Sequence, residues 1–310
     1  MASNLYQAVY AQRGIALTFL ASIIWSLNSL GTTFSTKTVS PWTLCFVNSL
    51  LYLPSLFFIQ WESSHRYRLS DGLLILFTGV FDSLSLCFAT LGLTYTAIGN
   101  ACALIFSKPL LCVILAKLFL NESLVVYDIG LVVINFLGVI LIFKPPLLFG
   151  NTFTDVELLG SVAALVSAVC GAFVLLFIRK LVERNAYDSA LLLLVKGIVG
   201  HAFYGFLIFT NITSQDHMKT PLDWSFVILT CLAAVIACTL TYLALKSEDA
   251  SVVALVTTAE VVWSYLLQVV FTDDRLEPSV TVGAFLIMIA PVFLAIRGIL
   301  STQPENENES

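Results

Sequence analysis

The stretch ALIFSKPLL, residues 103–111, places Lys108 and Pro109 in the middle of an apolar run that extends from Ala97 to about Leu118. About 20 apolar residues are what a helix needs to cross the ~30 Å hydrocarbon core of a bilayer. A cation at the centre of such a helix costs roughly 2.5–3.5 kcal/mol, and a proline removes a backbone hydrogen bond. Both are tolerated where the helix faces protein, water or a ligand instead of lipid. The stretch therefore predicts a polar region inside a membrane protein.

The whole chain has the composition of a multi-pass membrane protein. Of its 310 residues 58% are hydrophobic and 11% are charged, and the mean hydropathy is +0.93. A soluble domain has about 25% charged residues, so the polar residues are too few to cover a water-facing surface. All seven cysteines fall in apolar runs, where we interpret them as small hydrophobic residues. We predict ten transmembrane helices, at residues 14–36, 42–60, 72–94, 97–117, 127–143, 158–178, 188–210, 225–245, 250–271 and 278–297.

Lysine and arginine in the connections predict the orientation of the chain. If the N-terminus is cytoplasmic, the cytoplasmic side carries Arg13, Arg66, Arg68, Lys117, Arg179, Lys180, Arg184, Lys246 and Arg297. The other side then carries only Lys37, Lys144, Lys219 and Arg275. Because cytoplasmic loops are enriched in these residues, we expect both termini in the cytoplasm, in either the plasma membrane or an endomembrane. Asn211, in the sequon NIT, is then a candidate N-glycosylation site on the opposite side.

The two halves of the chain repeat each other. When residues 93–124 are laid over 244–275, Ala103-Leu104 meets Ala254-Leu255 and the acidic Glu122 meets Asp273. Both halves also open on a glycine followed by small residues at helical spacing, GIALTFLASIIWSLNS from Gly14 and GSVAALVSAVCGAFVL from Gly160. Five spans per half is an odd number, so the second half inserts with the opposite orientation. Inverted repeats of this kind are typical of secondary transporters.

These residues also carry a family resemblance. The stretches GIALTFLASIIWSLNS, LTYTAIGNACALIFSKPLLCVILAKLFLNESL and YLALKSEDASVVALVTTAEVVWSYLLQVVFTDDRLE resemble the two EamA repeats of the drug/metabolite transporter superfamily. The stretch GLVVINFLGVILIFKPPLLFG is similar to the G-type members of solute carrier family 35. The resemblance implies an all-α fold of ten transmembrane helices, alternating access and transport of small organic metabolites. Trp25, Pro109 and Glu122 match the repeat pattern, whereas Lys108 is not expected from it.

The domain boundaries follow from the spans and the repeat. We expect a cytoplasmic N-terminus at residues 1–13, a first five-helix repeat at 14–144 and a linker at 145–157. A second five-helix repeat follows at 158–298, and a disordered acidic tail occupies 299–310.

Five ionisable residues lie well inside the predicted spans: Asp82, Lys108, Lys196, His201 and Glu260. The repeat overlay places Lys108 one residue from the counterpart of Glu260, so the fourth and ninth spans each bring a charge to mid-membrane. We expect Lys108 to attract an anionic substrate group and Glu260 to act as a counter-charge or to bind a proton or cation. Two alternatives remain open. Asp82 and Lys108 are a structural pair or part of the binding site, and Lys196 either takes part in coupling or extends toward the cytoplasmic surface.

Further residues complete the predicted site. Pro109 is expected to bend its helix, and His201 is either a packing residue or a coupling residue. Aromatic and amide side chains near mid-membrane are candidates for lining the binding site: Trp25, Asn28, Tyr95, Phe106, Trp263 and Tyr265.

Other classes of protein fit the sequence less well. The chain contains no H-E-x-x-H helix, phosphate-binding loop, G-x-S-x-G turn or Cys/His metal spacing, so we expect neither an enzyme nor a cofactor. A potassium-type selectivity filter is also missing. We predict a transporter of a small organic, anionic metabolite that works by exchange or facilitated diffusion. A proton-coupled transporter and a non-transporting membrane regulator are the alternatives. The expected partners are the substrate and the bilayer, with a homodimer as an open option and no nucleic acid.

Overall fold

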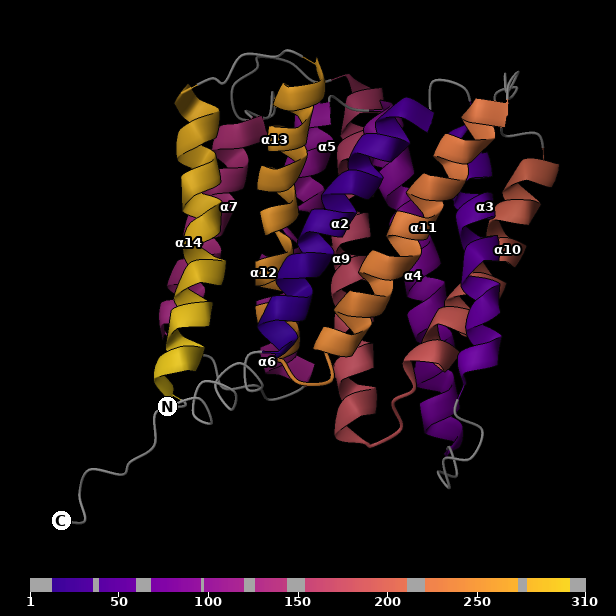
Figure 1. The fold of residues 1–310 in the computed structure, drawn as a ribbon, viewed down its shortest axis with the longest axis horizontal. Helices are drawn as coiled ribbons and strands as arrows, with labels where there is room; N and C mark the ends of the chain where they lie inside the picture. Colours follow the sequence, from indigo (N-terminus) through magenta and orange to yellow (C-terminus); the bar gives the residue numbers. More distant parts are fainter. Residues whose placement is uncertain are drawn as a thin grey trace.

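The computed structural model describes residues 13–35, 39–59, 68–95, 98–119, 126–143, 154–210, 221–272 and 278–301. Within these ranges every element is a helix, which confirms the predicted all-helical fold (Figure 1). The first half contains α2 (Arg13–Ser35), α3 (Pro41–Tyr52), the short 3₁₀ helix η1 (Leu53–Phe58), α4 (Leu69–Tyr95), α5 (Ile98–Ile105), α6 (Lys108–Phe119) and α7 (Val126–Phe143). The second half contains α9 (Asp155–Glu183), α10 (Ser189–Phe209), α11 (Pro221–Ala244), α12 (Ala250–Thr257), α13 (Ala259–Thr272) and α14 (Pro278–Ser301).

Most of these helices are suited to a bilayer by length and composition. Six helical segments of the described chain are long and apolar enough to cross a membrane: Arg13–Thr32, Pro41–Phe58, Leu69–Leu93, Asp155–Glu183, Ser189–Phe209 and Trp224–Ala244. Shorter apolar helices lie at Ile129–Ile142, Ala250–Ser264 and Thr281–Leu294. The protein is therefore a multi-pass membrane protein, and the total of ten spans stays a prediction.

Polar side chains at two connections explain where the second half begins its helices. Thr154 caps α9 through a capping box, in which Thr154 Oγ1 accepts a hydrogen bond from Glu157 N–H and Glu157 Oε2 accepts one from Thr154 N–H. Asp188 caps α10 by accepting hydrogen bonds from the N–H groups of Ala190 and Leu191. Such caps satisfy donors that the first turn of a helix leaves unpaired.

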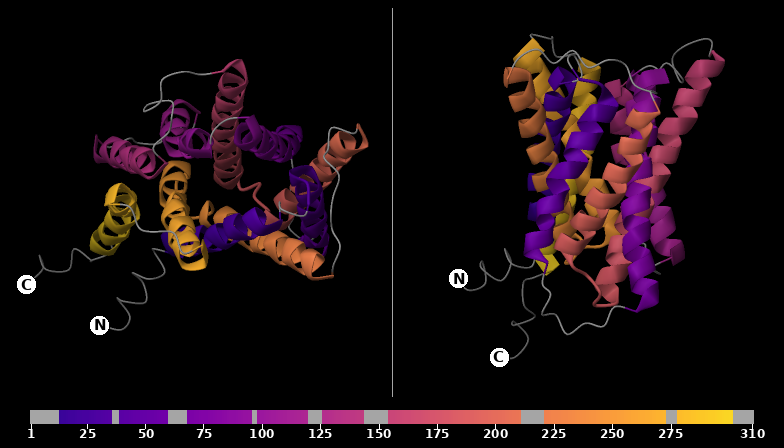
Figure 2. Two further views of the ribbon diagram at one scale, coloured as in Figure 1. Left: turned by 90° about the horizontal axis from the view of Figure 1, so that it is seen from above. Right: turned by 90° about the vertical axis from the view of Figure 1, so that its right-hand side faces the viewer.

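The two halves pack against each other in matching pairs. Helix α4 packs along α9 and α11 along α2, while α7 with α14 and α3 with α10 form opposite edges of the bundle (Figures 1 and 2). Exchanging each helix for its counterpart in the other half converts this set of contacts into itself. Gly14, at the start of α2, and Arg179, near the end of α9, both contact the turn between α11 and α12. Counterparts α2 and α9 therefore run in opposite directions.

Small residues allow these helices to approach closely. A Cβ atom added to Gly92 of α4 would lie 3.0 Å from the Cβ of Ala164 on α9. One added to Gly31 of α2 would meet the side chain of Thr230 on α11. Since lipid tails give helices little hydrophobic reason to associate, close van der Waals packing of small residues is a main source of stability.

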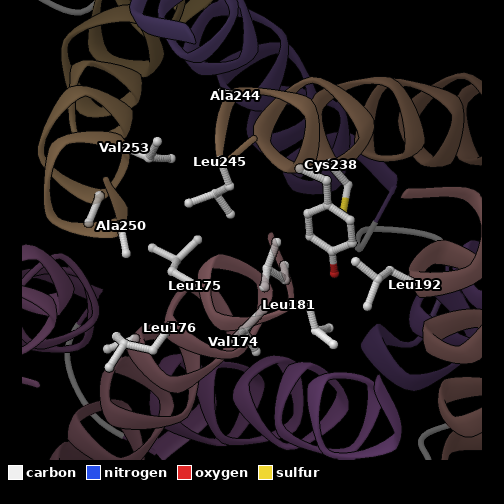
Figure 3. Packing of buried hydrophobic residues seen from close by; sticks show 14 of the residues in the cluster. Val174, Leu175, Leu176, Leu181, Leu192, Cys238, Ala244, Leu245, Ala250 and Val253 are labelled. Carbon is white, nitrogen blue, oxygen red and sulfur yellow. The ribbon is translucent and has the colours of Figure 1, made fainter. Parts of the chain in front are cut away.

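The largest apolar cluster lies at the end of the bundle where α9 finishes and α12 begins. Leu175 and Leu181 of α9 meet Leu245 and Val253 from the α11–α12 region, and Leu192 of α10 packs beside them (Figure 3). All five side chains are at most 5% exposed. This end of the bundle is consequently well packed around the turn between α11 and α12.

Candidate functional site

Two helices of the bundle are interrupted at equivalent positions. Phe106 and Ser107 separate α5 from α6, and Thr258 separates α12 from α13. The sequence overlay aligns Ser107 with Thr258, and the structure gives both the same hydrogen bond. Ser107 Oγ donates to the carbonyl of Leu104 and Thr258 Oγ1 to that of Leu255, each at 2.6 Å. The hydroxyl groups thus satisfy carbonyls at the breaks, as non-helical backbone within a membrane requires.

Pro109 has a different effect from the one predicted. It does not bend a continuous helix, because the break precedes it and Pro109 is the second residue of α6. A proline in the first turn of a helix costs little, since its missing N–H would have had no partner within the helix. Pro109 therefore helps to start α6 after the break.

Lys108 is the first residue of α6. Its side chain runs past Gly171 of α9, where an added Cβ would lie 3.1 Å from Lys108 Cδ and 3.2 Å from Ser85 Oγ of α4. Among the described residues, no hydrogen bond or ion pair joins the Lys108 ammonium. A positive charge at the positive end of a helix is unfavourable. A negatively charged group beside Lys108 would therefore be stabilising.

Glu260 occupies the opposite electrostatic situation. It lies in the first turn of α13, where a carboxylate is favoured by the helix dipole, and its Oε1 accepts a hydrogen bond of 3.0 Å from Ser29 Oγ on α2. Lys108 is near enough to interact electrostatically with this carboxylate but forms no ion pair with it. The two breaks thus bring opposite charges near each other. The Glu260 carboxylate has a hydrogen-bond partner, and the Lys108 ammonium has none in the part of the chain that the structure describes.

Asp82 has a partner that the sequence did not indicate. Its Oδ2 lies 2.5 Å from Lys196 Nζ, so α4 is joined to α10 by an ion pair. The structural pair considered for Asp82 and Lys108 is therefore wrong in this structure. Lys196 Nζ also donates to Cys238 Sγ at 3.3 Å and lies 4.7 Å from the centre of the Tyr52 ring. Lys196 consequently does not extend to the surface. Cys238 is not only a small hydrophobic residue, because its sulfur accepts a hydrogen bond.

The predicted lining residues are distributed over several contacts. Trp25 Nε1 donates to Thr241 Oγ1 at 3.5 Å, and Asn28 Nδ2 donates to the Thr230 carbonyl at 2.9 Å. Both interactions join α2 to α11. Tyr95 is the last residue of α4 and is 43% exposed.

Two further predicted residues pack against aromatic rings. Trp263 meets Phe19 edge to face, with ring centres 5.7 Å apart, and within the described chain its Nε1 has no hydrogen-bond partner. His201 packs on Phe46 with ring centres 4.1 Å apart, and the described residues offer no partner to its Nδ1. The candidate glycosylation site Asn211 lies outside the described residues.

Comparison with known proteins identifies the family. The sequence matches the EamA-like transporter family at residues 12–144 and again at 158–296. The chain belongs to this family. The matches cover most of the chain, and they confirm the resemblance seen in the sequence. They also point to a transporter and not to an enzyme.

Two relatives of this EamA-like protein carry the name of solute carrier family 35. Solute carrier family 35 member G1 of Mus musculus is 26% identical over 259 residues, which is 82% of this chain and 69% of the relative. The Homo sapiens protein of the same name is 25% identical over 297 residues, covering 92% of this chain and 79% of the relative. A crystal structure described only as that of a protein has the same fold, with a TM-score of 0.76 at 17% identity over 90% of this chain and 96% of that one.

Sequence reasoning missed several residues of this EamA-like site. Ser107 and Thr258 were already aligned by the repeat overlay, so a shared hydroxyl at that position was a usable signal. Ser29 and Gly171 gave no such signal, because their importance depends on which helices lie next to α13 and α6.

A polar cluster holds the turn between α11 and α12. Arg179 of α9 donates to the Leu245 carbonyl at 3.2 Å and forms an ion pair of 2.9 Å with Asp249. Glu248 in this turn packs on Gly14 and accepts a hydrogen bond from the Ile15 N–H. Burial, reinforced by the charge of Asp249, raises the pKa of Glu248 to about 7 against the opposing effects of the Ile15 N–H and Arg179. The cluster ties α2, α9 and α12 together at one end of the bundle.

Proposed function

We propose that the protein is a secondary transporter that carries a small organic anion by alternating access, as an exchanger or a facilitated carrier. Lys108 would be the group that attracts the anion. The observation that carries this proposal is the position of Lys108 at the start of α6, beside a helix break and without an ionic partner among the described residues.

Electrostatics favour an anion over a cation at this position. The ammonium of Lys108 and the N-terminal end of α6 both present positive charge, so a bound anion would relieve an unfavourable contact. Glu260 attracts cations less strongly, because Ser29 and the start of α13 already stabilise its carboxylate. A mid-membrane lysine costs roughly 2.5–3.5 kcal/mol by insertion scales, and such a cost is typical of residues that serve a function.

The architecture supports transport as the function. Two EamA-like repeats, each with a break at the aligned hydroxyl residue, fit ten spans arranged as inverted repeats with both termini in the cytoplasm. In transporters of this type, interrupted helices near the repeat interface carry the substrate site. The relatives named solute carriers are consistent with a small solute as cargo.

The test is uptake by the purified protein in liposomes, with a panel of radiolabelled anionic, zwitterionic, neutral and cationic metabolites. We expect saturable uptake of at least one anion, and loss of that uptake in Lys108→Met without loss of expression or thermal stability. Lys180→Met is the matched control, because Lys180 pairs with Glu183 at an exposed site on α9. Full anion uptake by Lys108→Met would refute the role of Lys108, and no saturable flux across the panel would favour a non-transporting regulator.

A proton-coupled transporter is the second candidate, and the position of the Glu260 carboxyl group at the second helix break, beside the anion-attracting Lys108, favours it. A carboxylate in this position can exchange a proton with the transported anion. If it does so, an imposed pH difference should drive accumulation in the wild type and not in Glu260→Gln. Accumulation that ignores the pH difference would exclude this second mode.

A further inference from the structure

Four charged side chains alternate in sign across the middle of the bundle. Glu260 of α13 is followed by Lys108 of α6, Asp82 of α4 and Lys196 of α10. Glu260 interacts electrostatically with Lys108, and Asp82 is ion-paired with Lys196. The link between the two pairs is Ser85 of α4, since Ser85 Oγ and the Lys108 side chain both lie beside Gly171.

Asp82 lies on α4 one turn before Ser85, which is beside Gly171 together with the Lys108 stem. Asp82 precedes Ser85 by three residues on α4, and side chains at this spacing lie on neighbouring turns with about 5–6 Å between their Cβ atoms. The long, flexible stem of Lys108 and the Ser85 hydroxyl both lie beside Gly171. Rotation of the two side chains would bring the Lys108 ammonium toward the Asp82 carboxylate.

Lys196 prevents this alternative pairing. Its ammonium has three N–H donors, and the structure gives it three contacts: Asp82 Oδ2 at 2.5 Å, Cys238 Sγ at 3.3 Å and the face of the Tyr52 ring at 4.7 Å. The ion pair is largely enclosed, with the Lys196 side chain 14% and the Asp82 side chain 22% exposed. Asp82 is thus held by Lys196, while Glu260 accepts a hydrogen bond from Ser29.

We propose that Lys196 is a positioning residue that keeps Lys108 available to the substrate by holding Asp82. This inference rests on the proposed role of Lys108 in anion binding. Without Lys196, the carboxylate of Asp82 would turn to Lys108 and compete with the substrate from within the protein. The apparent dissociation constant rises in inverse proportion to the fraction of protein in which Lys108 is free, so occupation for nine-tenths of the time weakens binding about tenfold.

Thermal stability gives a test that needs no substrate. The melting temperatures of the wild type, Lys108→Met, Lys196→Met and the double variant form a double-mutant cycle. We expect Lys108→Met to be at least as stable as the wild type and Lys196→Met to fold, because Lys108 replaces Lys196 as the partner of Asp82. The double variant should lose much more stability than the two single losses together, since Asp82 then has no cation within reach.

The inference would be overturned if the losses in that cycle were additive. It would also be overturned if Lys196→Met did not fold while Lys108 is present. Lys180→Met, combined with Lys108→Met, is the control for loss of a lysine ion pair elsewhere and should show no coupling. Because Lys108 and Lys196 do not touch, coupling between them is not expected from a purely structural role of Lys196.

Transport kinetics give the second test, with the anion that the liposome panel identifies. Lys196→Met should raise KM about tenfold or more, while Lys196→Arg keeps the charge and should keep the KM. Removing the competitor as well, in Asp82→Asn/Lys196→Met, should return KM to the wild-type value. An unrescued KM in this folded double variant would refute the inference, whereas full anion uptake by Lys108→Met would refute the proposed function on which it rests.

Discussion

The contact between α7 and α14 allows a quantitative test of the relation between the two halves. A Cβ added to Gly138 of α7 would lie 2.7 Å from the carbonyl oxygen of Gly283 and 2.8 Å from Cγ1 of Ile287. A Cβ added to Gly283 of α14 would lie 2.7 Å from the carbonyl oxygen of Gly138 and 2.8 Å from Cγ1 of Ile142. Each glycine meets the other glycine and also the isoleucine four residues after that other glycine, as two-fold symmetry requires.

The expected cost follows from these distances. Ordinary van der Waals contact begins near 3.4 Å, so an alanine methyl group at either position forces the helix backbones apart by about 0.7 Å. Overpacking of this kind costs about 1–3 kcal/mol, and alanine returns about 0.8–1 kcal/mol through its higher helix propensity. We therefore expect Gly138→Ala and Gly283→Ala each to lose up to about 2 kcal/mol. This corresponds to a melting-temperature decrease of a few degrees.

The assay is thermal unfolding in detergent or nanodiscs, with Gly130→Ala as the control. Gly130 lies on the same helix α7, but an added Cβ would have no atom within 4 Å, so this variant should be no less stable than the wild type. Gly138→Ala and Gly283→Ala should lose equal amounts, and the double variant less than their sum, because the helices have already separated. Gly138→Ala as stable as Gly130→Ala would refute the contact, and clearly unequal losses would refute the two-fold relation.

Two further predictions concern the ends and the centre of the bundle. Because the pKa of Glu248 is about 7 in the folded protein and 4.5 for an exposed carboxyl, the folded state binds the proton more tightly, and stability should fall as pH rises from about 5 to 7. Melting temperatures measured across this range should decline in the wild type and stay flatter in Glu248→Gln; identical profiles would contradict this. Gly171→Val should raise KM for the anion, because its methyl groups displace the Lys108 side chain and the Ser85 hydroxyl, which donates to the Ser167 carbonyl; an unchanged KM, measured beside Gly130→Val, would show that the Lys108 stem does not set affinity.

The general fold was accessible from the sequence because its determinants are one-dimensional. The length of each apolar run is set by the thickness of the bilayer, and the repeat is visible when residues 93–124 are laid over 244–275. The helical class and the family were therefore predicted correctly. The position of the breaks was only partly predicted, since attention to Pro109 as a kink obscured the shared hydroxyl at Ser107 and Thr258.

The contacts of the site were less predictable, because a helix that is apolar on all sides does not reveal which face meets which neighbour. One of the two alternatives for Asp82 was a structural pair with Lys108, whose span follows after a short connection. The structure instead brings Lys196 to it from α10, in the other half of the chain. Trp25 similarly has its partner, Thr241, in the other half. Contacts between repeats depend on how the halves pack, which neither periodicity nor spacing encodes.

The arrangement of charges also connects the two modes of transport. An anion that binds Lys108 approaches Glu260, since these two groups interact electrostatically, and the pair of Asp82 with Lys196 has no charge to spare. A simple anion then adds a second negative charge beside one lysine, and uptake of a proton by Glu260 removes the excess. A zwitterion brings its own positive group to Glu260 and needs no proton. In the proposed mechanism, the charge of the substrate would decide whether transport is coupled to protons, so the pH dependence of flux would distinguish anionic from zwitterionic cargo.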